Sequence, residues 1–89
     1  MADIGNSNVQ LTLDAVMKSV VIEAARSEEL KEVLRRYLDA TRDMEIVPQR
    51  GSFWVLSGLH SGDKKQAYIS ASYTACVEFA LNSPVVNND

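Results

Sequence analysis

Two stretches of apolar residues with helical spacing occupy the first half of the chain. In the first, the apolar positions are Leu13, Val16, Met17, Val20 and Ala24. In the second, they are Leu30, Val33, Leu34, Tyr37 and Leu38. Side chains three or four residues apart share one face of a helix. Between the two stretches, Ser27 precedes Glu28 and Glu29, and a hydroxyl followed by acids is typical of a helix start. The pattern therefore predicts two helices, at about 12–25 and 27–43.

A short β-hairpin is expected over about 45–57. Residues 45–47 have the composition of a strand, which Pro48 ends or places at an edge because proline has no N–H for the ladder. Residues 49–52 are typical of a turn. The next run, Phe53 to Leu56, is apolar at every position. A strand of this kind is either buried on both faces or covered by a partner.

The last element has two interpretations. From Ala67 to Leu81 every odd position is apolar, which is the period of a strand. A second set of apolar residues in the same segment fits a helical face: Ile69, Tyr73, Cys76, Val77, Ala80 and Leu81. Fifteen residues of strand would extend about 50 Å, whereas a domain of this size is roughly 30 Å across. We therefore expect a C-terminal helix over about 64–82, with Asp63 and Gln66 as its capping box. In the alternative, 64–71 form a strand that pairs with 53–57.

Together these elements predict a single, mainly helical α+β domain. Its 89 residues are enough for one modest core and too few for two domains. The polar ends, at 1–10 and 84–89, are expected to be flexible tails, and 11–83 the folded domain.

Composition and charge narrow the classes of partner. Hydrophobic residues make up 46% and charged residues 24% of the chain, as in ordinary folded proteins. The formal net charge of −3 repels phosphate backbones, so a nucleic acid is not an expected partner. No stretch approaches the roughly 20 apolar residues that cross a bilayer, so no membrane partner is expected. A single cysteine, Cys76, cannot form an internal disulfide, which favours a reducing, cytoplasmic compartment.

The residue types of catalytic and metal sites are sparse. Gly58 and Gly62 lack the Lys and Ser or Thr of a phosphate-binding loop. One cysteine and one histidine cannot supply a structural zinc site in one chain. Cys76 lies on an apolar helix face, where a thiol is usually inert, and the carboxylates of the helix exterior are expected to be solvated. We therefore predict that the protein is not an enzyme and has no catalytic residue, metal or cofactor. The sequence does not exclude an active site built between subunits from copies of His60 or Asp63.

The remaining features favour a non-catalytic interaction protein: an adaptor, an inhibitor or a regulatory subunit. We expect it to form a homo-oligomer through the second apolar stripe, which otherwise packs inside one subunit. That predicted oligomer interface comprises Leu30, Val33, Leu34, Tyr37 and Leu38. A protein partner is expected to bind the hairpin region, because tryptophan and arginine are frequent in binding hot spots. The predicted partner-binding residues are Arg50, Phe53, Trp54 and His60.

The alternative is a protein that binds a small anion, such as a nucleotide. Arg50, Lys64 and Lys65 would meet the anion, while Trp54 or Tyr68 stacks on a ring. A helix that begins near residue 63 would add its free N–H groups.

Overall fold

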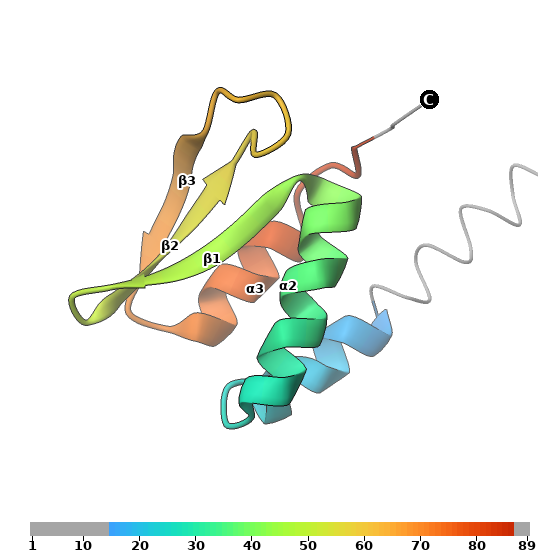
Figure 1. Cartoon of the computed structure of the whole chain (residues 1–89). Helices are drawn as coiled ribbons and strands as arrows, with labels where there is room; N and C mark the ends of the chain where they lie inside the picture. The colour runs from blue at the N-terminus through green and yellow to red at the C-terminus, as the bar shows by residue number, and fades with distance from the viewer. Residues whose placement is uncertain (1–14, 87–89) are drawn as a thin grey trace, which may run out of the picture.

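The structure is a computed structural model that describes residues 15–86. Figure 1 shows the order of the elements in this part of the chain. The N-terminal helix is described over residues 15–24, and it is followed by α2 (Glu28–Arg42), β1 (Met44–Gln49), β2 (Ser52–Ser57), β3 (Lys65–Ser70) and α3 (Tyr73–Leu81). The predicted α+β fold, with two N-terminal helices, a hairpin and a C-terminal helix, is confirmed. The predicted tail 1–10 and the expected helix start at 12 lie outside the described residues, as do 87–89.

The break between the first two helices lies where the sequence places it. The Ser27 side chain accepts a hydrogen bond from the backbone N–H of Leu30 at 3.3 Å, which caps α2. Glu28 and Glu29 occupy the first turn, where negative charge is favoured. At the other end, Asp43 adopts a left-handed conformation with φ 57° and stops the helix.

The three strands form one antiparallel sheet in the order β1-β2-β3. The β1–β2 hairpin closes through two residues, Arg50 and Gly51, between the paired Gln49 and Ser52. Both turn residues have positive φ, 43° and 83°, as a type I′ turn requires. The sheet register places Val47 and Trp54 opposite each other.

The alternative for 64–71 is confirmed: Lys65–Ser70 form β3, which pairs with β2. The helical interpretation of these residues, with its capping box at Asp63, is therefore wrong. Helix α3 begins at Tyr73, and its cap is Ser72, whose side chain accepts from the N–H of Ala75 at 3.2 Å. The β-favouring residues at 68 and 69 and the period of two agree with this strand, whose pairing with β2 decides between the two interpretations.

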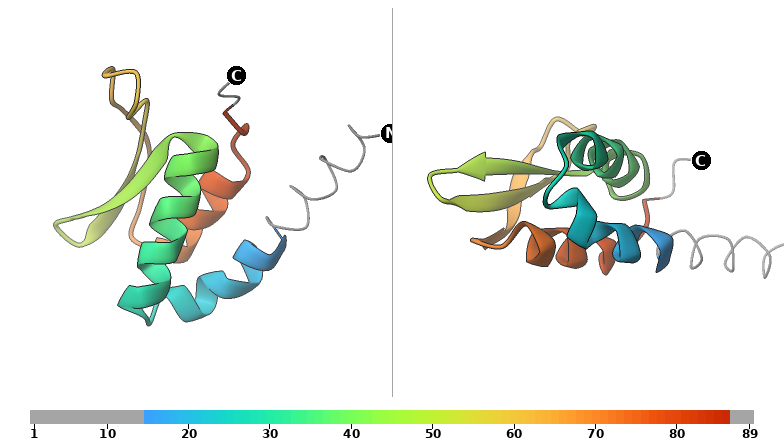
Figure 2. Two further views of the ribbon diagram at one scale, coloured as in Figure 1. Left: turned by 45° about the vertical axis from the view of Figure 1, so that its right-hand side comes forward. Right: turned by 90° about the horizontal axis from the view of Figure 1, so that it is seen from below.

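The elements form two layers. Seen from below in Figure 2, the hairpin and α2 form one row, while α3 and the N-terminal helix form the other. The core lies between them and comprises Val21, Ala24, Leu34, Leu38, Val77, Ala80 and Leu81. Tyr68 of β3 stacks on Phe79 of α3, with ring centroids 4.6 Å apart, so one face of the sheet packs on α3. Among residues 15–86, no helix is long and apolar enough to cross a membrane.

Arg42 joins the ends of two helices. It is only 3% exposed, and its guanidinium donates to the carbonyl of Leu81 at 2.8 Å and to the hydroxyl of Thr41 at 3.0 Å. Residues 84–86 return to the same place, because the N–H of Val86 donates to the carbonyl of Thr41 at 2.6 Å. The C-terminal ends of α2 and α3 are therefore held together.

Candidate functional site

The two adjacent aromatic residues of β2 lie on opposite faces of the sheet. Phe53 lies on the face that packs on α3: its ring meets that of Tyr73 edge-on, with centroids 5.5 Å apart. Val55, two residues on, is fully buried. Side chains alternate along a strand, so Trp54 lies on the other face.

That other face carries an apolar row across all three strands. Trp54 pairs with Val47 of β1 on one side and with Ile69 of β3 on the other. Ile69 is 45% exposed, whereas Val47 and Trp54 are partly buried. Leu56, two residues after Trp54, lies on the same face and is also partly buried. We call Val47, Trp54, Leu56 and Ile69 the open-face row.

No helix among residues 15–86 covers the open-face row. In Figure 1, α3 lies behind the sheet and α2 beside it, so the front of the sheet is uncovered. Single exposed apolar residues are ordinary on protein surfaces. Here one exposed and three partly buried apolar side chains occupy neighbouring positions on adjacent strands. Contiguous apolar patches on a surface are the usual mark of an interaction site.

The four predicted partner-binding residues are not brought together. Trp54 lies on the open face and Phe53 on the opposite one. Arg50 lies in the hairpin turn at one end of the sheet, and His60 lies in the loop at the other end. Sequence reasoning missed Val47, Leu56 and Ile69. Strand alternation would have grouped them with Trp54 once β3 was placed.

The predicted oligomer stripe lies mostly inside the chain. Leu34 and Leu38 are buried in the core, and Leu30 and Tyr37 pack against it. Val33 is 49% exposed. The stripe therefore serves chiefly to join α2 to the rest of the domain.

The predicted anion-binding residues are also dispersed. Lys64 lies 3.7 Å from a carboxylate oxygen of Glu45, and Lys65 lies 3.6 Å from one of Asp63. Arg50 is at the far end of the sheet from both lysines. Tyr68 is on the α3 side, stacked on Phe79, and therefore on the opposite face from Trp54.

A pocket of about 340 Å³ lies between α2, the hairpin and the start of α3. Its lining residues are Glu28, Lys31, Glu32, Arg35, Leu38, Ile46, Pro48, Phe53 and Tyr73. The charges pair within it: Lys31 lies 3.6 Å from Glu28, and Arg35 hydrogen-bonds Glu32. The Arg35 hydrogen bond lowers the pKa of Glu32 to about 2, and Arg36 adds to this. Burial, with the charge of Glu28, raises the pKa of Tyr73 to about 12, so its phenol stays neutral.

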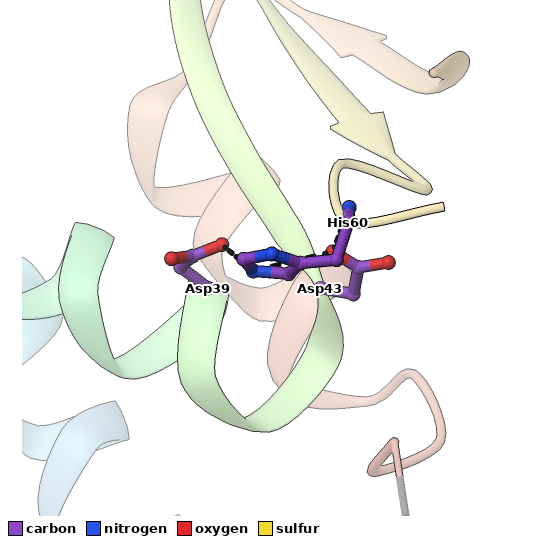
Figure 3. Close-up of side chains that lie close together, drawn as sticks. All are labelled: Asp39, Asp43 and His60. Carbon is purple, nitrogen blue, oxygen red and sulfur yellow. Dashed lines mark hydrogen bonds and ion pairs between the residues drawn. The ribbon is translucent and has the colours of Figure 1, made fainter. Parts of the chain in front are cut away.

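A third cluster joins the end of α2 to the loop after β2 (Figure 3). The imidazole Nε2 of His60 lies 2.9 Å from Oδ1 of Asp39 and 3.7 Å from Oδ1 of Asp43. The backbone N–H of His60 also donates to Oδ1 of Asp43, at 3.0 Å. Sequence reasoning assigned these two carboxylates to solvent. Their spacing of four residues at a helix end was the only local signal.

The structure does not bring Cys76 and His60 together as a catalytic pair. Cys76 is buried, and its thiol donates to the carbonyl of Phe53 at 3.5 Å. Burial raises the pKa of this thiol, which disfavours the thiolate that a nucleophile needs. His60 is exposed beside the two aspartates.

No known protein family, curated protein or solved structure matches this chain.

Proposed function

We propose that this chain is a non-catalytic interaction protein that binds a protein partner on the uncovered face of its sheet, with Trp54 at the centre of the contact. The observation that carries the proposal is the position of Trp54: on the middle strand, away from the core, with Val47 and Ile69 beside it. Tryptophan is among the residues most enriched in binding hot spots, which lie near the centre of an interface.

The surroundings of the open-face row support the same function. Glu45 and Gln49 alternate with the core-facing residues of β1 and therefore lie on the open face, beside the row. An apolar centre with a polar rim is the usual anatomy of a protein interface. We therefore expect the partner to present a segment with apolar side chains against the row and polar groups at its edge.

The proposal separates partner binding from the helical stripe. Leu34 and Leu38 are already buried within one chain, so they are not available to a second one. The proposal also places the protein in a reducing compartment such as the cytoplasm, because its single cysteine is a buried thiol.

Site-specific photo-crosslinking tests the proposal. A photoreactive amino acid replaces Ile69 at the edge of the row or, as a matched control, Arg36, whose side chain is 76% exposed on α2. In the cells that make the protein, we expect position 69 and not position 36 to capture one defined partner. Equal capture at both positions, or capture only of a second copy of this chain, would contradict the proposal.

Calorimetry with the purified partner then measures the contribution of the row. We expect Trp54→Ala to weaken binding by about 30-fold or more, as truncation of a hot spot does. Ile69→Lys, which changes an exposed position, should also weaken binding, and Arg36→Ala should leave the affinity within about twofold. Unchanged affinity in folded Trp54→Ala and Ile69→Lys proteins would overturn the proposal.

A further inference from the structure

We propose that Asp39, Asp43 and His60 form a binding site for one divalent transition-metal ion, with Zn²⁺ as the representative. Each residue offers one ligand atom, and the three atoms lie within 4.8 Å of one another. The site is distinct from the open-face row, and its existence does not depend on the proposed function.

The spacing of the ligand atoms suits a metal ion after a small adjustment. Bonds of about 2.1 Å to one Zn²⁺ place neighbouring ligand atoms roughly 3.0–3.4 Å apart, depending on the coordination geometry. The distances from the imidazole Nε2 of His60 to the carboxylates of Asp39 and Asp43 are 2.9 and 3.7 Å. Changes of about an ångström in side-chain position would therefore bring all three atoms to bonding distance.

The backbone holds the ligands in place without help from an ion. Asp43 is the left-handed residue that ends α2, and its N–H donates to the carbonyl of Asp39 at 3.2 Å. The N–H of Gly58 donates to the carbonyl of Asp43 at 3.1 Å, and the N–H of His60 donates to its side chain. The helix end and the loop after β2 are thereby fixed to each other, so His60 is presented to both carboxylates.

The electrostatics of the helix end favour a cation. The C-terminal end of a helix carries partial negative charge, and Asp39 and Asp43 add two carboxylates there, four residues apart, where like charges repel. Arg42, the adjacent cation, is buried and donates to the carbonyl of Leu81 and the hydroxyl of Thr41. A divalent ion beside the two carboxylates would relieve this repulsion.

An open space adjoins the ligands. Together with Ala40 and Val86, the three residues line a pocket of about 280 Å³. Three protein ligands leave at least one coordination position for water, which this space can hold.

The donor set selects the class of metal. One imidazole nitrogen with two carboxylate oxygens suits borderline ions such as Zn²⁺ and Fe²⁺. Ca²⁺ and Mg²⁺ take oxygen ligands and do not use imidazole in this way.

The test uses the sole histidine of the chain as a spectroscopic probe. Chelator-treated full-length protein, labelled with ¹⁵N, is titrated with ZnCl₂, and the ring nitrogen signals of His60 are followed by NMR. We expect the Nε2 signal to shift and saturate at one equivalent of Zn²⁺. Calorimetry in parallel should give a stoichiometry of one.

Substitutions locate the ligands. His60→Ala, Asp39→Asn and Asp43→Asn should each weaken Zn²⁺ binding by about tenfold or more, and asparagine at 43 keeps the left-handed helix end. Asp63→Asn, an exposed carboxylate in the same loop, is the matched control and should leave the affinity unchanged. Trp54→Ala should also leave it unchanged, which separates this test from that of the proposed function.

The proposal is overturned if the His60 ring signals do not move at one equivalent of Zn²⁺. It is equally overturned if His60→Ala binds Zn²⁺ as tightly as the unchanged chain does, because the ion would then bind elsewhere.

Discussion

The two ends of α2 differ in how well their charges match the helix dipole. At the first turn, the Ser27 cap and the acids Glu28 and Glu29 match the positive end of the helix. At the last turn, Arg42 matches the negative end of the helix, but Asp39 and Asp43 place two acids beside it. Folded chains depart from such local preferences mostly at functional sites. The first end of α2 therefore serves folding, whereas the second end also carries the candidate metal site.

The largest effect is expected from the buried cation at the second end. Arg42→Ala should lower the free energy of unfolding by about 3 kcal/mol. The substitution removes the hydrogen bond from the guanidinium to the buried carbonyl of Leu81, and it leaves a void where the side chain was. Urea unfolding, followed by Trp54 fluorescence, measures this loss. Arg36→Ala, at an exposed site of the same helix, is the control, and an equal loss in both variants would contradict the role of Arg42.

At the first end, a smaller and purely structural effect is expected. Ser27→Ala should cost about 1 kcal/mol of stability, since the N–H of Leu30 loses its acceptor. Ser27→Asn keeps an acceptor and should unfold at nearly the same urea concentration as the unchanged chain. If both variants were equally destabilised, the cap would not be the reason for the helix boundary.

Removing a carboxylate charge at the second end should raise the stability of the fold, whereas the two substitutions above lower it. In metal-free buffer at pH 8, Asp39→Asn is expected to raise the unfolding free energy by about 0.5 kcal/mol, because it relieves repulsion at the helix end while the amide oxygen can still accept a hydrogen bond from His60. With saturating Zn²⁺ the order should reverse, since the unchanged chain gains more from the ion. Thermal unfolding with and without Zn²⁺ measures both values. Loss of stability in metal-free Asp39→Asn would show that the helix end is not electrostatically unfavourable.

The smallest effect is expected from the exposed charges in the middle of α2. Arg35 and Arg36 hydrogen-bond Glu32 and lower its pKa in the folded chain to about 2. A lowered carboxylate pKa stabilises the fold above the unfolded value near 4.5 and ceases to do so as the pH falls through about 2. Glu32→Gln should thus be slightly less stable at pH 7 and indistinguishable at pH 2. High salt should shrink the difference at pH 7. A gap that persisted at pH 2 would exclude the ion pairs as its source.

The helix boundaries could be predicted because their causes are local. Ser27 and the two glutamates after it lie within one turn of the helix that they start, so the sequence alone carries the signal. The same holds for the hairpin, whose turn residues are adjacent in the chain. The strand at 65–70 could not be decided in this way. Its apolar positions could be grouped either as a strand or as part of a helical face, and only the pairing with β2, a contact between distant residues, separates the two.

The candidate sites depend still more on distant contacts. Trp54 could be singled out by its residue type, but Ile69 becomes its neighbour only through the pairing of β2 with β3. His60 likewise reaches Asp39, 21 residues earlier, because the loop after β2 returns to the end of α2. The spacing of residues along the chain does not show that Trp54 lies beside Ile69 or that His60 lies beside Asp39.

Because of Pro48, the two edge strands of the sheet, β1 and β3, differ in how well they can pair with an added strand. On β1, the proline removes one N–H from the row that an added strand would need. The border formed by β3 contains no proline and keeps its full set of main-chain donors. An added strand would therefore find more main-chain donors along β3 than along β1.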